Sequence, residues 1–252
     1  LGADTILLGT GVYTLSLFGT GEDNAFWGDL DITDDLTIIG AGSGRTIIDA
    51  DFLDRIFHIF TGVNVSIRGV TLVNGDVTRV EDGGAILNFG NLTLEDVEIR
   101  NSQANRGGAL FNNGVVTMTS SEFVQNTAIA DGGAIYNSDT GTLTVYTSTI
   151  ADNDAENGGG VYNSVMGTLE IVDTTLDGNT ATVAGGGVYN SSEVAVGNGE
   201  GGEGGDIPVP PDPIPTSQYH IEVVFTDTSL TASQQAIFNR QPTAGAKLLS
   251  VM

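Results

Sequence analysis

The chain of 252 residues contains no cysteine. This excludes disulfide cross-links, thiol catalysis and zinc sites built on cysteine. Proline is absent before residue 208, and because proline cannot donate a hydrogen bond in a strand ladder, that stretch suits continuous strands. No apolar run reaches the roughly 18 to 20 residues that a membrane-spanning helix needs. Helix signals are nearly absent before residue 228.

Basic residues are also scarce: 8 lysines and arginines stand against 32 acids, for a net charge of −24. This charge repels nucleic acid and anionic membrane surfaces, so we expect neither nucleic-acid binding nor membrane insertion of this chain. Solubility explains the acidic surface. Bound divalent metal or a cationic partner is the alternative explanation.

What is present is a repeat. A hexapeptide recurs at spacings of 24, 25, 26 and 27 residues. It consists of two glycines, a small residue, two variable positions and a final asparagine. Its copies are 83–88, 107–112, 132–137, 158–163 and 185–190. Between copies, two apolar residues seven positions apart precede a second asparagine. Self-similarity at such a period is typical of solenoids.

The segments between the glycine pairs are β-branched and alternate in polarity, as in 143–150, so they predict strands. Each unit is too short to bury its own apolar face, and stacking of units solves this. We therefore predict an all-β fold, a right-handed single-stranded parallel β-helix of roughly eight coils over residues 1–196, about 40 Å long. A disordered Gly/Glu- and Pro-rich linker over 197–217 and a truncated strand–helix remnant over 218–252 are expected to follow.

The asparagines recur with the period of the fold, so we predict that they stack as structural ladders and do not bind a ligand. The first ladder comprises Asn88, Asn112, Asn137, Asn163 and Asn190. The second comprises Asn126, Asn153 and Asn179.

An aromatic column, Phe111, Tyr136, Tyr162 and Tyr189, precedes the first asparagine in successive repeats. Residues at equivalent positions of stacked coils lie above one another, so the rings are expected to form a row. An outward row would make an apolar stripe for a glycan or a protein partner, and an inward row would be core. We favour core or partly covered packing.

Asp29 and Asp31 lie two residues apart, which places both carboxylates on one face of a strand. Carboxylates suit calcium, the one cofactor that the sequence suggests. A solvated acidic face is the alternative, and no calcium-loop consensus is present. His58 lies in an alternating segment and is interpreted as a structural histidine.

Two resemblances follow from these motifs. The GGAILN-type hexapeptides together with Phe123-Val-Gln-Asn126 resemble polymorphic outer membrane protein repeats. Residues 28–50 are similar to the opening coils of secreted bacterial β-helix proteins of the CSLREA type. These resemblances imply an extracellular or cell-surface location and a role as a stalk, adhesin or surface-structure element.

Enzymes that act on polysaccharides also use this architecture, and they need a positioned base or paired carboxylates on neighbouring coils. Asp152 and Asp173 are candidate acids, but no histidine and basic partner accompany them at matching positions. We therefore predict no catalytic residues and no enzymatic activity, and keep a carbohydrate-binding or carbohydrate-active β-helix as an alternative. Residues 219–238 are similar to the start of leishmanolysin-like metallopeptidase domains, so an N-terminal accessory region of a larger secreted metallopeptidase is a further alternative. The zinc motif His-Glu-x-x-His is absent.

Overall fold

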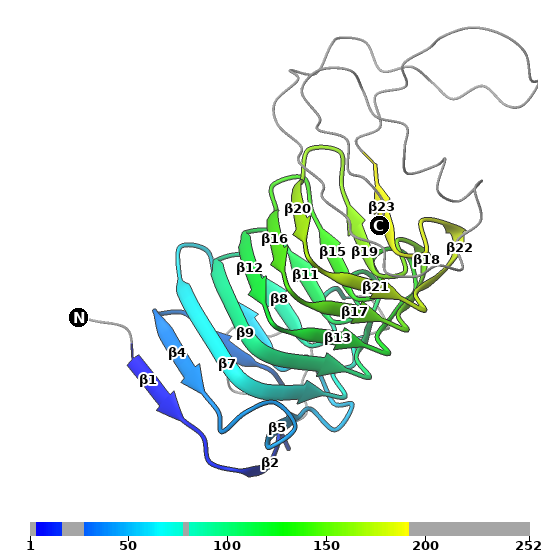
Figure 1. Ribbon diagram of the computed structural model, residues 1–252. Coiled ribbons are helices and arrows are strands. Elements are labelled where there is room, and N and C mark those ends of the chain that lie inside the picture. The colour runs from blue at the N-terminus through cyan, green and yellow to red at the C-terminus, as the bar shows by residue number, and fades with distance from the viewer. Residues whose placement is uncertain (1–3, 17–27, 78–80, 192–252) are drawn as a thin grey trace, which may run out of the picture.

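The computed structural model describes residues 4–16, 28–77 and 81–191. Every regular element in these ranges is a β-strand, and the strands wind into a right-handed parallel β-helix (Figure 1). Within the same ranges there is no helix that could cross a membrane. The predicted linker (197–217) and remnant (218–252) lie outside the described residues.

The largest sheet, called the long sheet here, has 12 strands. Its main path consists of β1 (Asp4–Leu7), β4 (Leu36–Ile39), β7 (Asn64–Val73), β9 (Asn91–Arg100), β12 (Val115–Thr119), β16 (Thr142–Tyr146) and β20 (Thr168–Val172). The other members follow a bend in each coil: β2 (Gly11–Thr14), β5 (Thr46–Asp49), β13 (Glu122–Val124), β17 (Thr149–Ala151) and β21 (Thr175–Asp177).

Two further sheets close the coil, and all their strand pairs are parallel. The short sheet contains β10 (Gln103–Ala104), β14 (Thr127–Ala128), β18 (Asp154–Asn157) and β22 (Thr180–Ala184). The back sheet contains β3 (Leu30–Ile32), β6 (Phe57–Ile59), β8 (Ile86–Asn88), β11 (Leu110–Asn112), β15 (Ile135–Asn137), β19 (Val161–Asn163) and β23 (Val188–Asn190).

Seven strands in the back sheet correspond to about six complete turns, fewer than the eight predicted. The prediction applied the spacing of the later repeats to the whole chain. The first coils are longer, since Asp4 pairs with Leu36 and Leu36 pairs with Val65. The additional residues lie in loops, so the same length of chain forms fewer turns.

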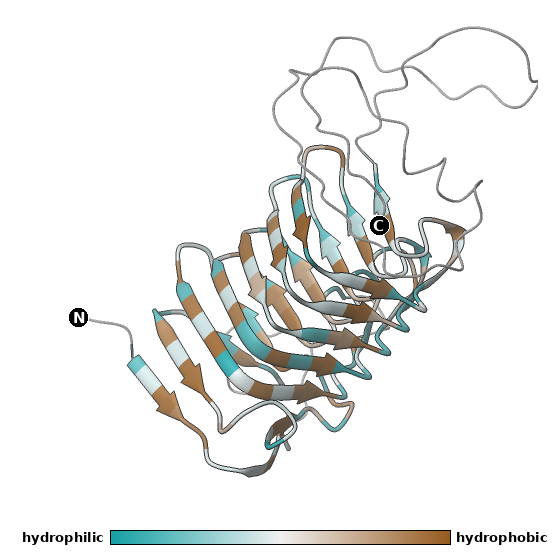
Figure 2. Cartoon of the chain, in the orientation of Figure 1, coloured by the Kyte–Doolittle hydropathy of each residue, from teal (hydrophilic) through white to brown (hydrophobic). Residues whose placement is uncertain are grey.

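The core lies between the long and back sheets and is built from columns of aliphatic side chains. Along the strands, apolar and polar residues alternate, as the bands of Figure 2 show. Inward residues of the back sheet, Ile86, Leu110, Ile135 and Val161, are fully buried. Strands of period two bury one face in this way, so each coil contributes one layer to a continuous core.

The two glycines of each hexapeptide serve different purposes. The first has positive φ, for example 63° at Gly107, a conformation that side chains with a Cβ disfavour. The second lies where successive coils meet backbone to backbone: a Cβ on Gly108 would lie 2.2 Å from the carbonyl oxygen of Gly133. Neither position tolerates another residue without displacement, which explains why both recur.

Candidate functional site

The first asparagine column is a continuous chain of side-chain hydrogen bonds inside the turn after the back sheet. The Nδ2 of Asn88 donates to Oδ1 of Asn112 at 2.8 Å, and Asn112 donates to Asn137 at 2.8 Å. Asn137 continues to Asn163, and Asn163 to Asn190 at 3.1 Å. The four earlier members are fully buried, so their amides are used in joining coils.

The second asparagine column lies in the turn after the long sheet. Asn126 donates to Asn153 at 3.0 Å, and Asn153 donates to Asn179 at 2.9 Å. The oxygen of Asn153 also accepts the backbone N–H of Asn126 at 2.8 Å. Buried backbone donors need such partners, and this column supplies them from the neighbouring coil.

A third column, of hydroxyl groups, was missed in the sequence. Ser121, Ser148 and Thr174 are buried at the bend of the long sheet. Ser121 accepts the backbone N–H of Val97 at 3.1 Å, and Ser148 accepts that of Ser121 at 3.1 Å. The available signal was a hydroxyl residue recurring at the coil spacing, 27 residues from Ser121 to Ser148 and 26 from Ser148 to Thr174.

The aromatic column runs along the outer surface of the back sheet, not in the core. Phe111, Tyr136, Tyr162 and Tyr189 are paired in register, and successive ring centroids lie 5.0, 5.0 and 5.1 Å apart with nearly parallel planes. Alternation turns them away from the buried column of Ile135. Phe111 and Tyr136 are nevertheless only 8 % exposed, so the column faces outward and is partly covered, the second of the two arrangements expected from the sequence.

Stacking in this column limits what the rings can offer to a partner. Their faces are turned toward one another along the rod, so few ring faces are left for contact. At the near end, the guanidinium of Arg106 lies 5.1 Å from the centroid of Phe111 and 4.8 Å from that of Tyr136. Asp82 holds this guanidinium through two hydrogen bonds, at 3.1 and 2.6 Å.

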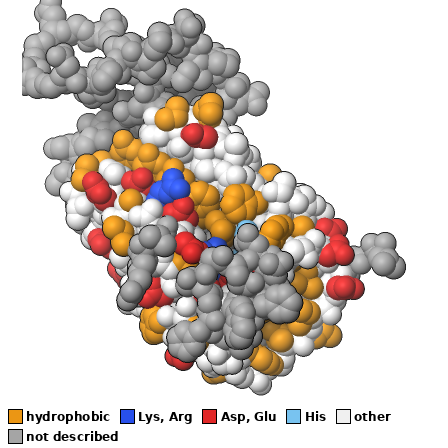
Figure 3. Space-filling model, turned by 180° about the vertical axis from the view of Figure 1, so that it is seen from behind, with side chains coloured by type: hydrophobic (Ala, Val, Ile, Leu, Met, Phe, Trp, Pro, Cys, Tyr) orange, Lys and Arg blue, Asp and Glu red, His pale blue; other side chains and the backbone are white. Residues whose placement is uncertain are grey.

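Beside Arg106 lies a shallow hollow of about 410 Å³ with an apolar floor and charged walls. Its lining residues are Arg55, Glu81, Asp82, Leu87, Phe89, Arg106, Phe111 and Asn113. Figure 3 views the molecule from behind and shows hydrophobic side chains gathered next to basic and acidic ones. The hollow therefore presents hydrogen-bond donors and acceptors above an apolar surface.

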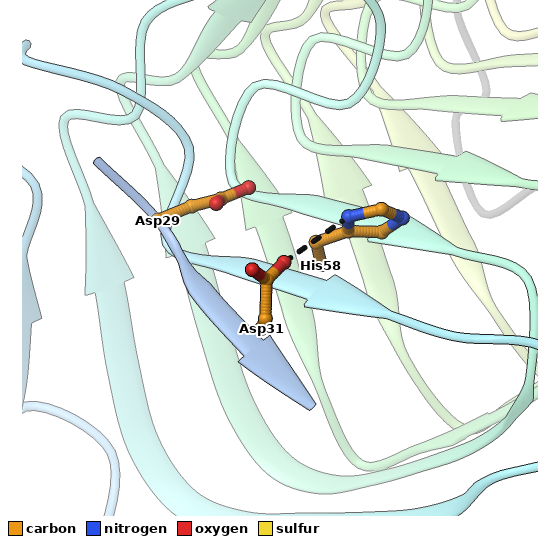
Figure 4. A group of neighbouring side chains, drawn as sticks. All are labelled: Asp29, Asp31 and His58. Atoms are coloured by element: carbon orange, nitrogen blue, oxygen red, sulfur yellow. Dashed lines mark ion pairs between the residues drawn. The ribbon is translucent and has the colours of Figure 1, made fainter. Parts of the chain in front are cut away.

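At the start of the back sheet, Asp29, Asp31 and His58 converge (Figure 4). Asp31 of β3 pairs in register with His58 of β6, and Asp29 directly precedes β3. One ligand atom from each residue lies within 4.8 Å of the others. Asp31 Oδ1 is 3.3 Å from His58 Nδ1, and the two side chains are 2 % and 9 % exposed. The structure thus brings the predicted aspartates together and adds His58, which had been interpreted as structural.

Arg55 is the cation of this cluster. Its Nε lies 3.3 Å from Asp29 Oδ2, and its Nη2 contacts Glu81. Burial raises the pKa of Asp29 to about 7 although Arg55 opposes the shift, and Asp54, Asp31 and Glu81 add to it. Burial likewise raises the pKa of Asp54 to about 6. The cluster carries more carboxylates than cations.

The Chlamydia polymorphic membrane protein repeat matches residues 120–138 and 173–191. Both segments contain a positive-φ bend, a strand after it and a complete glycine-pair hexapeptide. No curated protein and no solved structure matches the chain. These two segments of the parallel β-helix are therefore similar to polymorphic membrane protein repeats, which fits a surface-associated repeat protein.

Proposed function

We propose that this protein is a non-enzymatic β-helix rod that acts outside the cell or at its surface as a stalk or adhesin. The observation that carries the proposal is that the recurring residues make contacts that hold the coils together. The asparagine and hydroxyl columns bond to the coils above and below them, and the glycine pairs allow close approach of backbones. A repeat used in this way supplies length and a regular surface. The match to a membrane protein repeat supports the location.

The outer surface of the back sheet is the part of the rod best suited to touch a partner. It combines the aromatic row, Arg106 and the neighbouring hollow in one region. Aromatic and arginine side chains contribute much of the energy of protein interfaces. A protein or glycan partner would meet ring edges and tyrosine hydroxyl groups there, because the ring faces are stacked on each other.

An uncharged glycan is the second candidate partner, favoured by the hollow. Sugar hydroxyl groups need both donors and acceptors, and the pair Arg106–Asp82 offers both above Leu87 and Phe89. Binding of this kind requires no catalytic group. An accessory role beside a metallopeptidase rests on residues 219–238, outside the described residues, and stays a hypothesis that a downstream His-Glu-x-x-His motif would support.

The test is binding of the purified chain to a glycan array and to intact cells, with a parallel assay of polysaccharide depolymerisation. Tyr162→Thr shortens the aromatic row, and we expect it to reduce binding by about tenfold, the effect of removing a good interface residue. Tyr146→Thr is the matched control, since Tyr146 lies in β16 of the long sheet. It is expected to bind like the parent chain.

Equal loss of binding in both tyrosine variants would place the contact elsewhere or indicate a folding defect, which circular dichroism would detect. Measurable depolymerisation by the parent chain would overturn the non-enzymatic proposal. If Asp152→Asn or Asp173→Asn abolished that turnover, the alternative of a carbohydrate-active β-helix would replace it.

A further inference from the structure

We propose that Asp29, Asp31 and His58 form a binding site for a borderline transition metal ion, with Zn²⁺ as the best fit. The site lies at β3 and β6, the first two strands of the back sheet (Figure 4). It requires nothing of the proposed surface function. It also differs from the calcium site expected from the sequence.

The donor set decides the class of metal. Calcium prefers six to eight oxygen ligands, whereas this site offers one imidazole nitrogen and two carboxylates. Imidazole suits zinc, copper and nickel, and zinc accepts three protein ligands plus a water molecule. The histidine therefore shifts the preference from calcium to zinc.

The distances agree with this assignment. Zinc bonds of about 2.0 to 2.1 Å to nitrogen and oxygen place two tetrahedral ligands about 3.4 Å apart. Asp31 Oδ1 and His58 Nδ1 lie 3.3 Å apart, and all three ligand atoms fall within 4.8 Å of one another. Closing around an ion would draw these atoms from within 4.8 Å to about 3.4 Å of one another.

The surroundings support a divalent cation. Among the described residues, Asp29, Asp31, Asp54 and Glu81 are grouped with the guanidinium of Arg55, and the two ligating aspartates are nearly buried. A carboxylate has two oxygens, so Asp29 can keep Arg55 on Oδ2 and offer the other oxygen to the ion. Ligating carboxylates are commonly held by such an outer partner.

The ion would join two coils where the asparagine column ends. At the positions of the first asparagine column, β3 and β6 carry Ile32 and Ile59 instead of asparagine. The first two strands of the back sheet therefore lack the amide hydrogen bonds of that column. A metal bridging β3 and β6 would tie them together instead.

The experiment is titration of the chelator-treated full chain with ZnCl₂ by calorimetry, with CaCl₂ in parallel. We expect one Zn²⁺ per chain and no comparable uptake of Ca²⁺. Asp31→Asn and His58→Gln each remove a ligand with little change of shape and are expected to weaken Zn²⁺ binding by at least about tenfold. Substitution with Co²⁺ should give the visible absorption of a tetrahedral nitrogen–oxygen site and lose it in both variants.

His220→Gln is the matched control because the chain has only two histidines. Full Zn²⁺ affinity in this variant supports the site, and loss of binding there would assign the metal to the tail. The proposal is overturned by absence of Zn²⁺ binding, by binding that both ligand variants leave unchanged, or by a preference for Ca²⁺. Circular dichroism of each variant separates loss of a ligand from loss of the fold.

Discussion

The middle coils (81–191) and the first coils (28–60) share one backbone register but use it differently. In the outer column of the back sheet the middle coils place Phe111 and three tyrosines, and the first coils place Asp31 and His58. At the positions of the first asparagine column, the first coils carry Ile32 and Ile59. In the middle coils, equivalent residues of the same kind are neighbours. In the first coils, an aspartate and a histidine are neighbours.

This difference separates two kinds of constraint. A middle residue such as Asn137 is explained by its copies in the adjacent coils. Asp29 is explained by one particular neighbour, Arg55. Residues that recur in the middle coils are therefore explained by folding. Residues of the first coils that do not recur are the candidates for binding chemistry. Four substitutions test how far this contrast holds.

The largest effect is expected for Gly108→Ala. The new Cβ would lie 2.2 Å from the carbonyl oxygen of Gly133, so successive coils must separate, at a cost of about 3 kcal/mol in the free energy of unfolding. Gly44→Ala in the first coils is the comparison: a Cβ there meets no atom within 4 Å, and only its φ of +74° costs about 1 to 2 kcal/mol. Urea denaturation measures both. Equal losses would mean that close packing of coils is no stricter in the middle.

Asn137→Ala should follow closely. It removes an acceptor for Asn112 and a donor to Asn163 in a fully buried turn, and each polar group left without a partner costs about 1 to 3 kcal/mol. Asn190→Ala, at the last strand of the column, should cost about half as much. Urea midpoints of the two variants provide the measurement, and a smaller loss for Asn137→Ala than for Asn190→Ala would contradict the ladder.

Tyr162→Leu is expected to have a moderate effect. It removes two ring stacks, with Tyr136 and Tyr189, and each aromatic pair contributes about 0.5 to 1.5 kcal/mol. Tyr146→Leu keeps those stacks and should change stability by less than about 0.5 kcal/mol. If thermal melting showed the two variants to be equal, the column would contribute nothing beyond its apolar area.

The last prediction concerns how the stability of the first coils depends on pH. The pKa of Asp29 is about 7 in the folded chain and near 3.8 when unfolded, so between these values the folded state binds more protons. Its contribution to stability therefore falls as the pH rises from about 4 to 7. The titratable and charged groups that surround the Asp29 carboxyl are Asp31, Asp54, Glu81, Arg55 and His58.

Asp29→Asn should flatten this slope, because it removes the carboxyl group whose raised pKa causes it. The measurement is denaturant midpoints at several pH values with a chelator present. Asp173→Asn, at a turn with φ of 49°, is the control and should leave the slope unchanged. A slope that Asp29→Asn does not alter would assign the pH dependence to other groups.

Much of the fold could be predicted because the repeat states it directly. The asparagines at 88 to 190 and the glycine pairs recur every 24 to 27 residues, and stacking follows from that. The outward direction of Tyr136 could not be predicted, because alternation fixes only that it opposes Ile135. Ser121 and Ser148 were missed because serine is common at turns and carries little information alone.

The meeting of Asp31 with His58 was hidden for a different reason. It depends on the register between two coils that share no motif, since the hexapeptide begins only at residue 83. The number of turns was overestimated for the same reason. Sequence periodicity specifies contacts between like residues, and contacts between unlike residues need the actual loop lengths.

The register between neighbouring middle coils is uniform in the back sheet, and this makes the rod modular. Excision of residues 107–131 would bring Leu87 beside Tyr136 and Asn88 beside Asn137, leaving every column continuous. The rod would shorten by about 4.8 Å, the spacing of one strand. Duplication of the same segment would lengthen it equally. The reach of such a protein can thus change during evolution in whole-coil steps, while each intermediate length keeps a complete set of bonds.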